Sequence, residues 1–293
     1  MNLQLLMPLG SPLAAALPRP VAEALADHIG ALGCRLAPAA RRRVRDNLRQ
    51  ILGEEAGEAH VRGAFRTYAR YYLAMMRLAH SAPRRAIGDV RWQGIEELDA
   101  SLGKGRGALV LSAHLGNWDV AGLALAQRYD GICVFAEALR PAVLFTFYSR
   151  VRQRHAVQAV AAGVRSRVPL EVLRGNGVLG LVADRAFGVR RVRVPCGDGA
   201  LEMPAGGIRL ALRAGAAIHS VFAVRVPDGF LVHLGPDLGP TSAGAGDETQ
   251  RVRRIGTIFA ETLCRTVRRH PDQWCLLHRI DPAADGAVAS GAA

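Results

Sequence analysis

The sequence has almost no lysine and few aromatic residues, and it lacks the cysteine patterns of metal and disulfide scaffolds. One of its 38 basic residues is lysine, Lys104, and aromatic residues make up 5% of the 293. No segment interleaves aromatic with basic side chains as a single-strand stacking platform does, so no nucleic-acid partner is expected. The five cysteines include no C-x-x-C pair, which predicts no metal site, no disulfide framework and a reducing compartment.

Several catalytic and membrane signatures are also missing. There is no G-x-S-x-G elbow, so a hydrolase nucleophile of that type is absent. The glycines of "SLGKGRG" precede an apolar run instead of joining a strand to a helix, which excludes a phosphate-binding loop or a dinucleotide fingerprint on context. Residues 1–20 are apolar but interrupted by prolines and lack a leading basic stretch. They are too broken for a spanning helix or a signal peptide, which leaves peripheral membrane contact open.

What the chain does contain is a large apolar content and an excess of arginine. Half of the residues are hydrophobic, enough for a substantial core, and the formal net charge is +13. Guanidinium groups pair well with phosphate and carboxylate. The expected partners are therefore anionic: a lipid surface, coenzyme A or an acidic carrier protein.

Hydrophobic periodicity divides the chain into a helical part and an α/β part. Residues 21–80 show helical spacing, whereas short apolar runs alternate with helical segments over residues 105–280. The expected strands are 108–112, 132–135, 157–160, 178–182 and 218–226, and the expected helices are 118–127, 141–155, 165–173 and 204–214. The alternation predicts an α/β fold with a mostly parallel central sheet flanked by helices. We expect one domain over residues 21–280, an added antiparallel edge strand in "DGFLVHLGP" and a disordered tail over residues 281–293.

One predicted helix aligns large side chains along one side. "AFRTYARYYLAMMRLA" places Phe65, Tyr68, Tyr72, Met75 and Met76 on a common face. Such a face packs into a core or forms an apolar wall for an acyl chain or a membrane. The sequence leaves both interpretations open.

The strongest chemical signal lies where an apolar strand ends. "ALVLSAHLGNWD" carries His114 just beyond the predicted strand and Asp119 five residues later. In open α/β sheets function collects at the carboxyl ends of strands. We therefore expect Asp119 to hold one ring nitrogen of His114 and to leave the other as a base. Without a nucleophile beside it, this base is expected to activate a hydroxyl group of the substrate, although spacing alone also fits a structural pair.

These residues carry a resemblance. "HLGNWD" resembles the H-x-x-x-x-D motif of the lysophospholipid acyltransferase superfamily, and its wording is similar to the bacterial lipid A biosynthesis acyltransferases and their relatives, the phosphatidylinositol mannoside acyltransferases. The stretches "FAEALRPAVLFTFYSRVRQRHAVQAV", "VLRGNGVLGLVADRA", "MPAGGIRLALRAGAAIHSVFAVR" and "HPDQWCLLHRI" resemble the same family in order. The resemblance implies the glycerol-3-phosphate acyltransferase-like fold.

The resemblance also implies roles for individual residues. His114 would be the general base, Asp119 would orient it, and Asp184 would assist the proton relay. The substrate-binding candidates are Glu137, Arg152, Asn117 and Arg185. Among these, Arg152 would bind a phosphate through both arms of its guanidinium group. The loop "RAFGVRRVRVP" would add a basic patch beside the site.

The activity so implied is transfer of a fatty acyl chain from acyl-CoA or acyl carrier protein to a sugar hydroxyl of a glycolipid. It needs no further cofactor and takes place peripherally, at the cytoplasmic face of an anionic membrane. Two alternatives remain: a non-catalytic protein that binds anionic lipid, and a thioesterase-like hydrolase.

Overall fold

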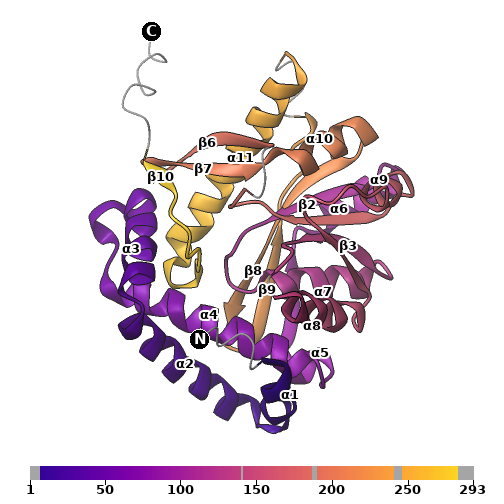
Figure 1. Ribbon diagram of the computed structural model, residues 1–293. Coiled ribbons are helices and arrows are strands. Elements are labelled where there is room, and N and C mark those ends of the chain that lie inside the picture. The colour runs from indigo at the N-terminus through magenta and orange to yellow at the C-terminus, as the bar shows by residue number, and fades with distance from the viewer. Residues whose placement is uncertain (1–6, 140, 187–189, 241–245, 283–293) are drawn as a thin grey trace.

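The N-terminal part is a layer of helices packed on one long central helix. The computed structural model describes residues 7–139, 141–186, 190–240 and 246–282. Helices α1 (Met7–Ala16), α2 (Arg19–Leu36) and α3 (Pro38–Leu52) precede α4 (Glu58–Leu78), and a short turn of helix, α5 (Pro83–Ile87), follows. Helices α1 and α2 both pack against α4, and Figure 1 shows them along the lower edge of the molecule. The expected helical part is thereby confirmed.

A seven-stranded sheet forms the centre of the molecule, with strand order β1-β9-β8-β2-β5-β3-β4. The strands are β1 (Asp89–Gln93), β2 (Ala108–Ser112), β3 (Ile132–Ala136), β4 (Val157–Ala161), β5 (Val178–Val182), β8 (Ala217–Val226) and β9 (Gly229–Leu234). Only the β8–β9 pairing is antiparallel. The α/β fold with a mostly parallel sheet is confirmed.

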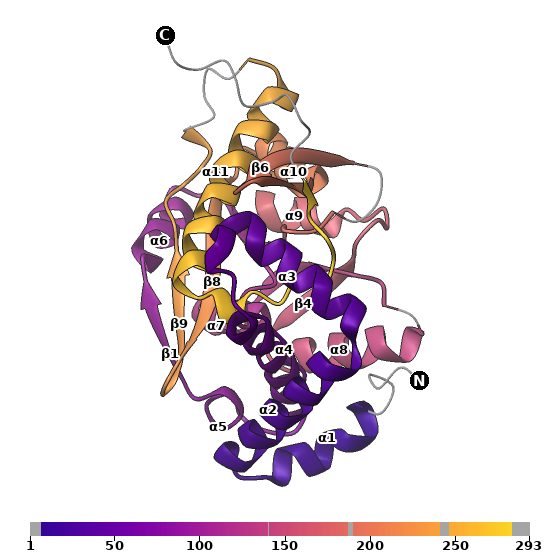
Figure 2. The same cartoon turned by 90° about the vertical axis from the view of Figure 1, so that its left-hand side faces the viewer.

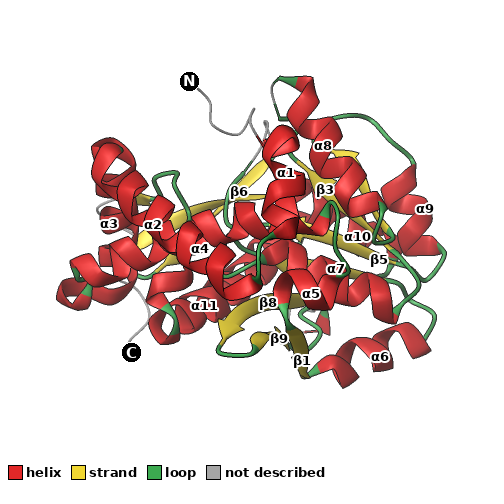
Figure 3. Cartoon of the chain, turned by 90° about the horizontal axis from the view of Figure 1, so that it is seen from below, coloured by secondary structure: helices red, strands yellow, loops and turns green. Residues whose placement is uncertain are grey.

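Helices cover both faces of this sheet, as Figures 1 and 3 show. They are α6 (Ile95–Gly103), α7 (Trp118–Arg128), α8 (Ala142–Gln153), α9 (Val168–Arg174), α10 (Ala205–Ala214) and α11 (Glu248–Arg269). Alternate residues of β2 enter two separate cores: Leu109 and Leu111 belong to one, Ala108 and Val110 to the other. Burial on both faces explains why the central strands are continuous apolar runs.

Two expectations about strands are wrong. The segment "DGFLVHLGP" does pair antiparallel as β9, but it is not an edge, because β1 pairs with it on its far side. Beyond residue 190, the arginine-rich loop becomes β6 (Arg191–Cys196), which forms a hairpin with β7 (Gly199–Pro204). A strand of two residues, β10 (Asp281–Pro282), joins this hairpin. The rest of the expected tail, residues 283–293, lies outside the described residues.

Candidate active site

The loop that carries His114 is held between a sheet strand and the C-terminal segment. The amide of Gly116 donates to the carbonyl of Gln273 at 2.8 Å, and the amide of Asn117 donates to the carbonyl of Ala223 at 3.0 Å. Gly116 has φ of 60°, and a Cβ atom there would lie 2.0 Å from the carbonyl oxygen of Ala223. Only glycine fits this turn.

His114 is paired with Asp184, not with Asp119. Nδ1 of His114 lies 2.7 Å from Oδ1 of Asp184. Ser112 and Val182 are register partners in the parallel β2–β5 pair, so residues two positions beyond each strand end meet at the same edge of the sheet. A carboxylate accepts hydrogen bonds, so Nδ1 carries the proton and Nε2 is left as the basic nitrogen.

The second oxygen of Asp184 is held as firmly as the first. Oδ2 accepts a hydrogen bond from the backbone amide of His114 at 2.9 Å and another from Nε1 of Trp274 at 3.1 Å. Burial by itself would raise the pKa of Asp184, but the nearby His114 and these hydrogen bonds outweigh burial and lower the pKa. The carboxylate is therefore an anion, fixed in position beside the imidazole.

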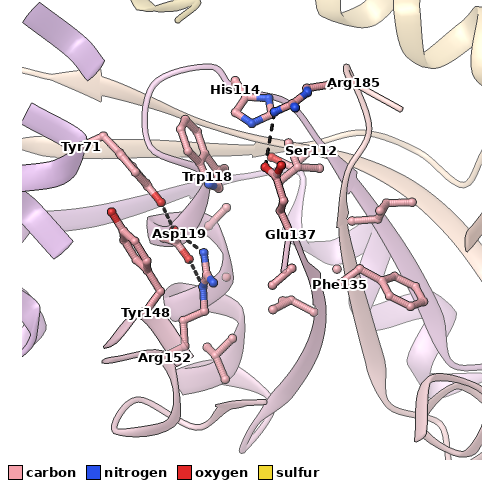
Figure 4. A pocket seen from close by; sticks show the side chains of 18 of the residues that line it. Tyr71, Ser112, His114, Trp118, Asp119, Phe135, Glu137, Tyr148, Arg152 and Arg185 are labelled. Atoms are coloured by element: carbon pink, nitrogen blue, oxygen red, sulfur yellow. Dashed lines mark hydrogen bonds and ion pairs between the residues drawn. The ribbon is translucent and has the colours of Figure 1, made fainter. Parts of the chain in front are cut away.

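Asp119 lies on the first turn of α7 and faces away from the His114 ring. Its oxygens accept two hydrogen bonds from Arg152, at 2.7 and 3.0 Å, and one from the Tyr71 hydroxyl at 2.8 Å. The expectation that Asp119 holds the imidazole is wrong, because the turn at Gly116 starts α7 in a direction that points Asp119 toward α4 and α8. Figure 4 shows the two groups apart.

The pairing of Arg152 also changes the role expected for it. Its guanidinium group uses Nε and one terminal nitrogen for Asp119, and its side chain is 14% exposed. Burial would lower the pKa of Arg152, but the Asp119 carboxylate raises it above the ordinary value. Arg152 is thus a partner of Asp119 in a buried ion pair, and both residues line the cavity beside His114. The two nitrogens bonded to Asp119 are not available for the bidentate contact with a phosphate that was expected.

The two charged sites are linked through aromatic rings. The His114 ring packs edge-on against Trp118 with centroids 4.8 Å apart, and Trp118 stacks on Tyr71 at 4.1 Å. Tyr71 in turn bonds Asp119. The Asp119–Arg152 pair therefore fixes Tyr71 and, through it, the wall against which the imidazole rests.

The remaining expected site residues separate into two groups. Asn117 caps the N-terminus of α7, since its side-chain oxygen accepts from the amide of Val120 at 3.2 Å, and it is 2% exposed. It does not line the cavity beside His114. Glu137 and Arg185 do line it, and Nη1 of Arg185 lies 3.4 Å from Oε2 of Glu137. Figure 4 shows this pair beside His114.

The cavity beside His114 has a volume of about 370 Å³. Its polar end holds His114, Glu137, Arg185 and His278. The Asp119–Arg152 pair also lines the cavity. The apolar part of the lining includes Val110, Ala121, Gly122, Leu125, Ile132, Val134, Gly180 and Val221. A ligand with a polar reactive head and a long apolar tail matches this lining, and the volume is within the usual range for ligand pockets.

Some residues of the helix face predicted from the sequence line the cavity, and others pack in the core. Tyr68 and Tyr72 line the cavity, whereas Phe65 and Met75 are buried in the two cores. The expected basic patch divides in the same way: Arg185 lines the cavity, and Arg191 lies on β6 paired with Glu202.

Sequence reasoning missed Tyr71, Trp274 and His278 as members of the site. The signal for Tyr71 was its place in "RYYLAMM", where its neighbours were noted. His278 lines the cavity close to His114, and burial followed by the charges of Arg185 and His114 lowers its pKa to about 4. It is neutral at neutral pH. Within the described residues no group of His, Cys, Asp and Glu side chains has the arrangement of a metal site.

An imidazole held by a buried carboxylate lies at a cavity lined mostly by apolar residues, an arrangement that fits a transferase of acyl chains. Residues 6–280 match the family described as bacterial lipid A biosynthesis acyltransferase. The chain belongs to this family.

The chain is also similar to two curated acyltransferases. A phosphatidylinositol mannoside acyltransferase of Mycolicibacterium smegmatis is 29% identical over 268 residues, covering 88% of this chain and 86% of the relative. Another, of Mycobacterium tuberculosis strain CDC 1551, is 30% identical over 251 residues, covering 80% and 75%.

Proposed function

We propose that this lipid acyltransferase moves a fatty acyl chain from a thioester donor to a sugar hydroxyl of a glycolipid, at the cytoplasmic surface of a membrane. The observation that carries the proposal is the His114–Asp184 pair at the polar end of an apolar cavity. The similarity to phosphatidylinositol mannoside acyltransferases supports a glycolipid acceptor. Acyl-CoA and acyl carrier protein are both candidate donors, because both carry the chain as a thioester. Acyl-CoA is the favoured donor and acyl carrier protein the second choice.

In the proposed reaction the acceptor hydroxyl attacks the thioester carbonyl directly. Nε2 of His114 takes the hydroxyl proton as the new carbon–oxygen bond forms. The Asp184 carboxylate, 2.7 Å from Nδ1, stabilises the imidazolium that results. When the carbon–sulfur bond breaks, the proton passes from Nε2 to the leaving thiolate. No covalent enzyme intermediate is needed.

Asp119 and Arg152 act in this proposal as positioning residues. Their buried pair holds Tyr71, which stacks on Trp118, the ring that contacts His114. Glu137 and Arg185 lie at the mouth of the cavity, where they would contact the acceptor or the donor headgroup.

The experiment compares wild type with His114→Ala and Asp184→Asn, using radiolabelled palmitoyl-CoA, then palmitoyl carrier protein, with glycolipid-containing membrane extract. We expect labelled glycolipid from wild type, none from His114→Ala, and transfer by Asp184→Asn slowed by about 10³-fold or more, because the imidazole loses the partner of its charged form. Unchanged far-ultraviolet circular dichroism controls for folding. Release of free fatty acid at a rate that rivals transfer would favour the hydrolase, and no turnover of either donor would refute the proposal.

The acyl chain is placed in the apolar interior of the cavity. A Cβ at Gly122 would lie 3.7 Å from Cδ1 of Ile132, which is ordinary contact. The first carbon of a side chain at Gly122 is thus accommodated, and Gly122→Leu directs the rest of the side chain into the cavity that Gly122 lines. We expect the variant to prefer shorter acyl-CoA donors than wild type does, measured by competition between chain lengths. An unchanged preference would contradict this placement of the chain.

A further inference from the structure

Seven of the nine exposed large apolar side chains in the described residues lie on two helices; the other two are Val143 and Val164. Those on α2 are Val21, Leu25, Ile29, Leu32 and Leu36, and those on α1 are Leu9 and Leu13. These seven residues, called here the outer face of α1 and α2, are between 45% and 80% exposed. Single exposed apolar residues are ordinary, but a contiguous set marks an interaction surface.

Helix α2 buries small residues and exposes large apolar ones, the reverse of a helix whose outer side faces water. Its buried side consists of the small residues Ala22, Ala26, Gly30 and Cys34. At Gly30 an added Cβ would lie 2.6 Å from the Cα atom of Arg66 on α4, so small residues are needed for this close approach. The large apolar residues of α2 lie on the other side and leave about half or more of their surface exposed. Such an arrangement fits an apolar environment outside the protein.

The exposed charged side chains near this face are basic, and the acidic ones are neutralised by arginine. Both acidic residues of α2 are paired with arginines: Glu23 with Arg19 and Arg225, and Asp27 with Arg70. The exposed charged residue at the end of α2 is Arg35, and the next helix exposes Arg42 and Arg43. An apolar surface bordered by arginine matches a bilayer that carries anionic headgroups.

Helix α1, which carries part of the outer face, contacts residues of the cavity wall through its buried side. Helix α1 packs on α4, which supplies Tyr68 and Tyr72 to the cavity lining. The Tyr148 hydroxyl, also in that lining, donates to the sulfur of Met7 on α1. Figure 2 shows α1, α2, α4 and α8 grouped together.

We propose that the outer face of α1 and α2 docks the protein on an anionic membrane surface, with both helices lying in the headgroup region. No helix among the described residues is both long and apolar enough to cross the bilayer. The proposal deepens the proposed function, since it names the surface through which a lipid acceptor is reached.

The test is cosedimentation with vesicles of phosphatidylcholine, with and without phosphatidylglycerol. The test variant is the triple substitution Leu25→Glu, Ile29→Glu, Leu32→Glu. The matched control, Gln93→Glu, Ala100→Glu, Gln127→Glu, makes the same change in net charge at exposed positions of β1, α6 and α7. We expect the test variant to bind anionic vesicles at least about 100-fold more weakly than wild type, because three large apolar side chains are lost from the interface. The control should stay within about threefold, which is the weaker effect of screened charge.

Two outcomes would overturn the inference. Equal loss of binding in test and control variants would show that net charge alone attaches the protein. A wild-type dimer that the test variant dissociates, with vesicle binding unchanged, would assign the face to a second copy of the chain. His114→Ala should bind vesicles like wild type, so vesicle binding is read separately from the transfer reaction, and failure of one proposal does not conceal the outcome of the other.

Discussion

The buried pair of Asp119 and Arg152 gives the sharpest prediction. In the variant Arg152→Gln, the Asp119 carboxylate, whose side chain is 9% exposed, loses two hydrogen bonds and its counter-charge. Removing one partner of a buried ion pair costs about 3–5 kcal/mol. Tyr71 continues to donate at 2.8 Å, so we expect a loss near the lower limit, about 3 kcal/mol in the free energy of unfolding.

The companion variant is the double substitution Asp119→Asn, Arg152→Gln, in which no uncompensated charge is buried. Because neither residue is then charged, the double variant should be more stable than Arg152→Gln alone by about 1–2 kcal/mol. The assay is urea unfolding of wild type, the single variants Asp119→Asn and Arg152→Gln, and the double variant. The reasoning would be refuted if the two single losses added in the double variant, or if Arg152→Gln stayed within about 1 kcal/mol of wild type.

Three further predictions concern the surroundings of this site. Trp274→Phe removes a hydrogen-bond donor to Asp184. We expect kcat to fall about tenfold and the acid limb of the pH–rate profile to shift to higher pH. A purely structural role of Trp274 would leave the acid limb in place. Gly116→Ala forces a Cβ to 2.0 Å from the Ala223 carbonyl, and urea unfolding should show a loss above about 2 kcal/mol. The pKa of His278 is about 4 in the folded protein, below its ordinary value of 6.5. As pH falls from 6.5 to 4, the unfolded chain therefore binds a proton that the folded protein does not, and the free energy of unfolding decreases. His278→Gln should reduce that loss by about 1 kcal/mol, because the side chain is only partly buried and solvent screens its charge. Equal pH dependence in both proteins would contradict this.

The sequence by itself determined the buried central strands of the sheet and the place of His114 at the end of one of them. The continuous apolar runs of β2 and β5 predict buried parallel strands, because both faces of such strands are covered. A histidine directly after such a strand is placed at the carboxyl edge of the sheet, whichever strands lie beside it. Strands β1 and β6 were not predicted, although "DVRWQ" and "RVRVPC" alternate apolar with polar residues, as half-exposed strands do. Each run is only five or six residues long and lies in an arginine-rich or polar segment.

Only the tertiary structure decided which carboxylate serves His114. Asp119 is five residues away in the chain, but the left-handed turn at Gly116 and the start of α7 point it toward Arg152. Asp184 is seventy residues away, yet the pairing of β2 with β5 in register brings it to 2.7 Å. Strand order is set by which apolar faces pack together across the whole sheet, and local sequence does not encode it. A partner chosen by proximity in the chain was therefore the wrong one, and the right one follows from the adjacency of two strands.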